Sequence, residues 1–404
     1  MRQPDNLLDP RHFSRVRRPA LDAETLPPWC YTSKDWFDLE IERIFKRSWG
    51  YVGRVDRVPN AGDYVAFDYA GTPVIIVRAR DGKVRAFANS CRHRGSEILR
   101  AGSGTCKAAL KCPYHGWAYG LDGKLIGAAG MEETKDFDKA RHGLIPIRLE
   151  TWAGFMFINP GETGPSLLEW LDDLPELTAS YGFEDWACTR RREYELACNW
   201  KIIIENFNDE AHIRTVHPKT LLDISEKYAA PAVYEHGDGY WVGSYCEHEG
   251  TRLMVGGVDG PAGFDPVPTL KGRLKHGSYH PTVYPHVSFG FCIDGGWALE
   301  VYPLAPDRSK LVVNSFFHKD ALKRADFASV VQRYYDRLDV STDEDNAIEE
   351  AVQRGLVSPQ AKPGRLSQEE IGINWLHNWW LDQIFGVTTE SHKPDKVRAD
   401  ARAA

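Results

Sequence analysis

The sequence contains no run of eighteen apolar residues, although 42% of its 404 residues are hydrophobic. A helix that crosses a bilayer needs about 20 consecutive, mostly apolar residues, so we expect no membrane-spanning segment. Residues 1–6 lack the apolar core of a secretory signal. Basic residues form only small groups, such as residues 15–18, and the net charge is −7. This balance argues against nucleic acid as the main partner.

Cysteine is also scarce, with eight residues scattered along the chain, so we expect no disulfide framework. The sequence shows no internal repeat and no low-complexity tract. It also lacks a G-x-G-x-x-G pattern after a predicted strand, the pattern that binds dinucleotides. We therefore expect a cytoplasmic protein with reduced thiols that does not itself bind NAD or a flavin.

The length favours more than one domain. Residues 1–48 are predicted to form an extended arm followed by a helix that begins near Ser33, a residue suited to cap it. Short β-rich runs separated by turn residues predict an all-β domain over residues 49–165, with a closing strand at 151–159. Residues 166–404 are predicted to form a mixed domain.

In this second domain the hydrophobic pattern predicts helices and strands in alternating groups. The expected helices cover residues 167–177, a segment from Asn199, 327–338, 343–354 and 368–385. The expected strands cover residues 193–197, 240–245, 287–293, 297–302 and 311–317.

Two Cys-plus-His pairs dominate the first domain: Cys91 with His93, and Cys112 with His115, with eighteen residues between the pairs. Two thiolates on one iron and two imidazoles on the other can hold a [2Fe-2S] cluster. Neutral imidazole raises the potential to roughly −150 to +300 mV, against about −400 mV for all-cysteine plant-type clusters. A zinc site is the alternative, but zinc sites of this composition usually place two Cys together and then two His together. Cys106 lies between the pairs and is expected to pack.

The residues around these pairs strengthen the cluster interpretation. Gly95 follows the first pair, and Gly116 and Trp117 follow the second. The segments resemble the two loops of the Rieske family, C-x-H-R-G and C-P-Y-H-G-W. The resemblance implies a Rieske [2Fe-2S] domain.

A second possible metal site lies in the mixed domain. Asp209 and His212 are three residues apart and would share one face of a helix. His212 and His217 are five apart and would diverge on a regular helix, so the chain must leave the helix before His217 if both bind one metal. Pro218 favours such a break, because the residue before proline avoids helical geometry. Two His and one carboxylate make the facial triad of non-haem Fe(II) oxygenases, although a His pair at a helix end is also common as polar surface.

The surrounding residues resemble the catalytic domain of Rieske oxygenase large subunits. The shared pattern is Asn-Trp-Lys from Asn199, Glu-Asn-Phe from Glu205, and D-x-x-H-x-x-x-x-H-P from Asp209. The spacing is most similar to that of choline and carnitine monooxygenases. The family's E-D…E-x-x-Q-x-G-L run implies Asp345 as the third iron ligand. Asp343 and Glu344 are adjacent competitors, and an acidic helix start is an equally good structural explanation.

The resemblance covers nearly the whole chain and implies an α+β protein, with an all-β Rieske domain followed by a helix-grip catalytic domain built on an antiparallel sheet. It also implies one [2Fe-2S] cluster and one mononuclear Fe(II) per subunit, O₂ as co-substrate, and a homotrimer, with or without a small beta subunit. Electrons from NAD(P)H would arrive only through a separate flavin reductase, ferredoxin or both. Asp209 would connect His212 to His115 or His93 of the neighbouring subunit.

The predicted function is that of a terminal oxygenase component that hydroxylates an aromatic or other small organic substrate. The alternatives are oxidative N-demethylation of a methylated or quaternary amine, and a Rieske electron carrier. Asp at position 209, where choline- and carnitine-type enzymes usually carry Glu, weakens assignment to the amine branch. Asn206 and Phe207 are expected to line the substrate pocket. Most of Trp241, Phe289, Phe291 and Trp297 are expected to pack in the core. Residues 271–286 form a basic-leaning stretch that could meet an acidic substrate, but a solvated loop is the favoured interpretation.

Overall fold

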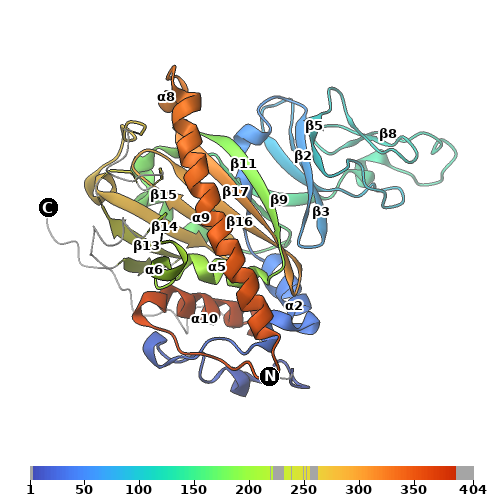
Figure 1. Ribbon diagram of the computed structural model, residues 1–404. Coiled ribbons are helices and arrows are strands. Elements are labelled where there is room, and N and C mark those ends of the chain that lie inside the picture. Colours follow the sequence, from blue (N-terminus) through green and yellow to red (C-terminus); the bar gives the residue numbers. More distant parts are fainter. Residues whose placement is uncertain are drawn as a thin grey trace. The chain divides into compact units, whose positions relative to one another are not determined.

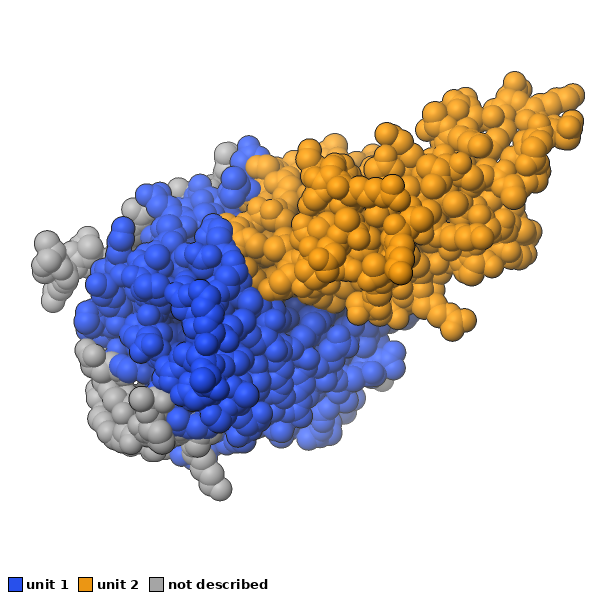
Figure 2. All heavy atoms as spheres, turned by 90° about the horizontal axis from the view of Figure 1, so that it is seen from above, with its two compact units in different colours: residues 1–44, 168–404 blue, residues 45–167 orange. Residues whose placement is uncertain are grey.

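The computed structural model (Figure 1) describes residues 3–218, 220–221, 232–237, 239–248, 250–251, 253–254 and 263–387. The chain forms two compact units, which Figure 2 shows in different colours. Unit 1 contains residues 1–44 and 168–404, and unit 2 contains residues 45–167. The N-terminal segment therefore belongs to the same unit as the mixed domain.

Unit 2 is an all-β structure. A seven-stranded sheet has the order β1-β10-β9-β4-β3-β2-β5, and a three-stranded sheet has the order β6-β7-β8. All the strand pairs are antiparallel. The strands are β1 (Gly50–Arg54), β2 (Asp63–Tyr69), β3 (Thr72–Arg78), β4 (Val84–Ala88), β5 (Gly102–Thr105), β6 (Leu110–Lys111), β7 (Ala118–Tyr119), β8 (Leu125–Gly127), β9 (Pro146–Trp152) and β10 (Phe155–Asn159).

The predicted closing strand at residues 151–159 is instead a hairpin. β9 ends at Trp152, and Phe155 of β10 pairs with it. Ala153 and Gly154 between them have φ values of 46° and 88°. Two successive positive φ values turn the chain back on itself in a tight hairpin, so one strand could not continue through this point.

Unit 1 is built on a second antiparallel sheet, with the order β11-β17-β16-β15-β14-β13-β12. Its strands are β11 (Trp186–Leu196), β12 (Val233–His236), β13 (Trp241–Glu247), β14 (Gly277–Val283), β15 (Val287–Phe291), β16 (Gly296–Ala305) and β17 (Arg308–His318). The strand β14 corrects the expectation of a solvated loop at residues 271–286. Seven residues of that stretch pair between β13 and β15, and His286 after them is buried.

The remaining elements are helices, two of which belong to the N-terminal segment. They are α1 (Trp29–Thr32), α2 (Lys34–Glu40), α3 (Leu167–Leu171), α4 (Leu174–Leu177), α5 (Trp200–Phe207), α6 (Ile213–Val216), α8 (Lys319–Leu322), α9 (Phe327–Leu356) and α10 (Ile371–Phe385). Ser33 caps α2 as predicted, because its side chain accepts a hydrogen bond from the N–H of Trp36. No described helix is long and apolar enough to cross a membrane.

Helix α9 is a single 30-residue helix, whereas the sequence predicted two shorter ones. Between them, the buried hydroxyls of Ser341 and Thr342 donate hydrogen bonds back to the carbonyl of Leu338, so both hydroxyls have a partner within the helix. The helix packs on the sheet, where Tyr334 meets Phe317 of β17 with ring centroids 5.1 Å apart. This long helix carries one of the predicted iron ligands.

Candidate active site

Two similar loops of unit 2 carry the predicted cluster residues Cys91, His93, Cys112 and His115. In the first loop the N–H of Gly95 donates to the carbonyl of Cys91, and in the second the N–H of Gly116 donates to the carbonyl of Cys112. Both glycines have a φ of 74°, a backbone conformation that other residues rarely adopt. The glycines that follow the Cys-plus-His pairs therefore close two matching turns.

The thiols of these loops are buried and the imidazoles lie nearer the surface. Cys91 and Cys112 are 3% and 2% exposed, whereas His93 is half-buried and His115 is exposed. The two imidazole rings lie with centroids 4.6 Å apart. His93 Nδ1 is buried, and no described residue forms a hydrogen bond with it. Such a ring nitrogen is available to bind a metal.

Hydrogen bonds also favour a thiolate at Cys112. Burial acts to raise the pKa of this thiol, but hydrogen bonds from the backbone of Tyr114 and His115 and from Cys91 outweigh it, and the pKa lies below its ordinary value. The thiolate is the form that binds metals. Two cysteines and two histidines in this arrangement fit a [2Fe-2S] cluster.

In unit 1, helix α5 leads into the second site, and polar residues anchor its start. Asn199 caps the helix by accepting the N–H of Lys201. The Nζ of Lys201 donates to Glu40 Oε1 at 2.6 Å, and Trp200 Nε1 donates to Glu40 Oε2 at 2.8 Å. Lys201 and Glu40 are 0% and 1% exposed. The Asn-Trp-Lys segment therefore fixes the start of α5 against the N-terminal helix α2.

Two side chains of α9 accept backbone hydrogen bonds from the residues just before α5. Glu350 Oε1 accepts the N–H of Ala197, and Gln353 Oε1 accepts the N–H of Asn199, both at 3.0 Å. These contacts explain the E-x-x-Q pattern. They set the position of α9 relative to the start of α5.

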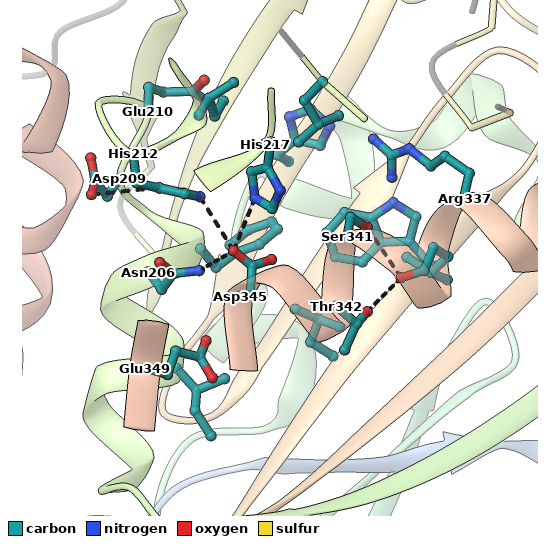
Figure 3. Close-up of a pocket in the computed structure, with 18 of the residues that line it drawn as sticks. Asn206, Asp209, Glu210, His212, His217, Arg337, Ser341, Thr342, Asp345 and Glu349 are labelled. Atoms are coloured by element: carbon teal, nitrogen blue, oxygen red, sulfur yellow. Dashed lines mark hydrogen bonds and ion pairs between the residues drawn. The ribbon is translucent and has the colours of Figure 1, made fainter. Parts of the chain in front are cut away.

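The predicted iron ligands converge in the wall of a cavity (Figure 3). His212, His217 and Asp345 each offer one ligand atom, and these atoms lie within 4.8 Å of one another. Asp345 Oδ1 is 2.9 Å from His217 Nε2 and 3.6 Å from His212 Nε2. Metal bonds of about 2.1 Å at right angles place two ligand atoms about 3 Å apart. The three side chains therefore need little movement to hold one metal ion.

The local backbone differs in part from the prediction. Helix α5 ends at Phe207, so Asp209 and His212 lie in the turn before α6 and do not share a helix. Helix α6 then ends at Val216, and His217 leaves it with φ −111° and ψ 47°, as the proline after it predicted. This break turns His217 toward His212, with ring centroids 5.1 Å apart.

The structure also separates Asp345 from its two acidic neighbours. Glu344 Oε2 lies 2.8 Å from His217 Nδ1, the ring nitrogen on the far side from Asp345, and Asp343 is exposed. Burial lowers the pKa of His217, but hydrogen bonds and charge from Asp345 and Glu344 outweigh it and hold the pKa above its ordinary value. Glu344 therefore fixes the orientation of the His217 ring and leaves Nε2 facing the ligand group.

Asn206 and Asp209 contact the same group. Asn206 Nδ2 donates to Asp345 Oδ1 at 2.9 Å. Asp209 Oδ2 lies 3.5 Å from His212 Nδ1, and its Oδ1 accepts the N–H of Ala211. Asp209 thus approaches His212 from the side opposite Asp345 (Figure 3).

The cavity beside this group holds about 970 Å³ of space, including its open mouth. Apolar side chains form much of its wall, among them Ile203, Phe207, Leu253, Trp297, Leu299 and Leu338. Its polar residues include Glu210, His280, Arg337, Ser341, Thr342 and Glu349. Burial, and then the charges of Asp345 and Glu350, raise the pKa of Glu349 well above its usual value. A cavity that combines apolar walls with several polar groups fits a small-molecule site.

A second group of possible metal ligands includes Glu210 and His280 of the cavity wall and Cys246 of β13. Cys246 Sγ lies 3.9 Å from Glu210 Oε1 and 3.9 Å from His280 Nδ1, so these three residues could also hold a metal ion. Nearby, the rings of Phe207 and Trp297 meet edge to face with centroids 5.2 Å apart. Rings in such close contact pack on each other and do not enclose a cation between them.

Sequence reasoning placed several cavity residues wrongly or not at all. Phe207 lines the cavity as expected, and Trp241, Phe289 and Phe291 are buried in the core. Trp297 lines the cavity, and so does His280, which had been assigned to a loop. Residues 277–283 show no regular alternation that marks a strand. Glu210 and Arg337 were not singled out, and nothing in the local pattern marks them.

Comparisons with known proteins agree with this architecture. The family model of the Rieske [2Fe-2S] domain matches residues 48–138, and that of the ring hydroxylating alpha subunit (catalytic domain) matches residues 183–386. The glycine betaine monooxygenase oxygenase subunit of Chromohalobacter salexigens is 30% identical over 389 residues, which cover 89% of this chain and 86% of that protein.

Choline monooxygenase of Spinacia oleracea is 30% identical over 372 residues, covering 89% of this chain and 78% of that protein. A solved structure of a quaternary ammonium Rieske monooxygenase superposes with a TM-score of 0.77 at 25% identity, covering 91% of this chain and 97% of that one. The chain therefore belongs to the Rieske oxygenases, as an alpha subunit in which a Rieske [2Fe-2S] domain precedes a ring-hydroxylating catalytic domain, and it is the terminal oxygenase component of such an enzyme.

Proposed function

We propose that His212, His217 and Asp345 hold the mononuclear iron of this oxygenase. The convergence of these three ligand atoms in the wall of the cavity carries the proposal. Iron(II) held by two His and one carboxylate keeps open positions and would supply dioxygen activation beside the substrate. Asn206 holds one oxygen of Asp345, and Glu344 orients His217, so both ligands are set before a metal binds.

Cys91, His93, Cys112 and His115 are the proposed ligands of the Rieske cluster. The buried thiols would lie on the inner side of the cluster and the two imidazoles on its outer side. The more exposed His115 would then face an electron-transfer partner. The electrons would come from NAD(P)H through a separate flavin reductase, a ferredoxin or both, in the cytoplasm.

Asp209 is the proposed connection between the two metal centres. Its carboxylate already lies beside His212 Nδ1, and it would accept a second hydrogen bond from His115 or His93 of the neighbouring subunit in a homotrimer, with or without a small beta subunit. A bond to an ionised carboxylate is stronger than a neutral one and would fix both rings. The related quaternary ammonium monooxygenase is described in terms of inter-subunit electron transfer, which supports this arrangement.

The proposed reaction is hydroxylation of a C–H bond in an aromatic or other small organic substrate. The apolar part of the cavity would hold the carbon skeleton and exclude water from the reacting carbon.

A second candidate is oxidative N-demethylation of a methylated or quaternary amine. Hydroxylation of an N-methyl carbon gives an unstable product whose C–N bond breaks, so that formaldehyde and the demethylated amine leave. The names of the relatives, glycine betaine and choline monooxygenases, favour it. So does the carboxylate of Glu210, which lines the cavity and could balance a cationic nitrogen. Asp209, where these branches usually carry Glu, weighs against it.

A screen of small substrates with a surrogate reductase tests the proposal. O₂ uptake, formaldehyde and hydroxylated products are read together. Hydroxylated product without formaldehyde supports the first reaction, and stoichiometric formaldehyde supports the second. Substrate-independent electron transfer, with cluster iron but no mononuclear iron in the purified protein, would instead support the electron-carrier alternative.

A further inference from the structure

Arg337 stands out among the residues that line the cavity. It is the only lysine or arginine in the described part of the cavity wall, where Asp209, Glu210, Asp345 and Glu349 are the acidic residues. Arg337 is only 7% exposed. A guanidinium is always charged and carries five N–H donors in a planar fork. One edge of it can contact the protein while another edge faces a ligand.

Helix α9 fixes the position of Arg337 relative to the proposed iron site. Arg337, Ser341 and Asp345 are spaced four residues apart and line the same cavity, so they lie along one face of α9. Figure 3 shows the Arg337 side chain reaching from α9 toward the cavity that Asp345 also faces. Eight residues of helix span about 12 Å along the axis. A substrate that contacts Arg337 would therefore extend along the cavity toward the iron ligands.

Apolar residues of the same cavity wall suit a carbon skeleton. Leu338 lies beside Arg337 on α9, and Leu299 and Trp297 of β16 face the same cavity. Such a cavity matches a molecule with one anionic end and an apolar body. An arginine binds a carboxylate through two parallel N–H···O bonds, which fix orientation as well as charge.

We propose that Arg337 binds a carboxylate of the substrate and that this oxygenase acts on an organic acid whose reacting carbon lies several bonds from the carboxylate. The inference rests on the proposed function, because it takes His212, His217 and Asp345 as the place of reaction. It selects a substrate class that either reaction could use, since an amine nitrogen near Glu210 is compatible with a carboxylate at Arg337. Arg337 is thus a specificity-determining residue.

Matched pairs of straight-chain carboxylates and their primary amides, from propanoate to decanoate, test this inference without turnover. Each compound is titrated calorimetrically into the anaerobic, iron-loaded protein. Acids of medium length are expected to bind about tenfold to a hundredfold more tightly than their amides, the range of a hydrogen bond to a charged group. Arg337→Gln should remove this difference, and Arg337→Lys should keep part of it, since lysine retains the charge and loses the planar fork.

His212→Ala serves as the control for direct binding of the carboxylate to iron. The preference for acids should persist in this variant, which is expected to lack mononuclear iron. The visible spectrum of the cluster verifies that each variant is folded. Failure of the proposed oxygenase reaction would appear separately, as absence of mononuclear iron or of substrate-dependent O₂ uptake. The inference is overturned if the wild-type protein shows no preference for acids, if Arg337→Gln retains the full preference, or if His212→Ala loses it.

Discussion

The two proposed metal sites use the same number of histidines but are built in different ways. The cluster residues lie within residues 91–115, on two matching loops that strands of one small unit hold side by side. The iron residues come from the two ends of α6 and from α9, between positions 212 and 345. A site made of two nearby loops can be predicted from a short sequence motif. A site made by packing distant helices depends on the whole unit, and its last ligand is ambiguous in sequence.

The sites also differ in what surrounds them. The cluster loops bury their thiols and leave His115 exposed, which suits transfer of electrons to another molecule. The iron group lies at a cavity and is oriented by Asn206 and Glu344. The comparison suggests that the two sites can be disabled separately.

His212→Ala should give the largest effect. Loss of one of three ligands is expected to remove the mononuclear iron and lower substrate turnover below detection, while the cluster in unit 2 stays intact. Iron content, the visible cluster spectrum and O₂ uptake measure the three quantities. Simultaneous loss of the cluster spectrum would contradict the independence of the two sites.

Asp209→Asn should interrupt the proposed hydrogen-bonded path between the cluster and the mononuclear iron, while both metal sites keep their iron. We expect turnover to fall about a hundredfold, because the neutral amide replaces a charge-assisted hydrogen-bond acceptor beside His212. Iron and sulfide contents should match the wild type. Rapid-mixing kinetics of cluster oxidation should locate the defect in electron transfer, and wild-type turnover would rule out the bridging role.

Glu344→Gln tests the orientation of His217. Loss of the carboxylate on Nδ1 is expected to weaken iron binding about tenfold to a hundredfold, a typical cost for a group that orients a metal ligand. Equilibrium dialysis with Fe(II) under anaerobic conditions gives the affinity. Asp343→Asn is the matched control, since Asp343 is the exposed neighbour and should bind iron like the wild type. Equal affinities of the two variants would remove Glu344 from the site.

Gly116→Ala should have the smallest effect and should act on the cluster loops alone. An added Cβ would meet only Lys111 Cε at 3.5 Å, an ordinary contact, so the cost comes from the φ of 74°. We expect a loss of about 1 kcal/mol in the stability of unit 2. The loss of cluster absorbance during thermal unfolding measures this change in stability. Gly364→Ala, at a position with open space and an ordinary φ, is the control and should leave the transition unchanged.

Sequence reasoning succeeded where the determinants were local. Pro218 predicted that the chain leaves α6 before His217, and Ser33 predicted the cap of α2. Prediction from sequence failed where tertiary contacts determine the secondary structure. Helix α9 continues through Ser341 and Thr342, whose propensity for helix is modest, because Tyr334 and other side chains pack against the sheet. The segment 277–283 has few of the apolar residues that mark a strand, and its pairing with β13 and β15 is what places it in the sheet.

The continuity of α9 has a consequence for how such an enzyme could change its substrate. Because Arg337 and Asp345 belong to one unbroken helix, backbone hydrogen bonds set the span between them, and no loop can lengthen or shorten it. Along the face that carries Arg337, Ser341 and Asp345, the charge would therefore move in four-residue steps of about 6 Å each. Exchange of the side chains at positions 337 and 341, by Arg337→Ser with Ser341→Arg, would make the smallest such step toward shorter acids.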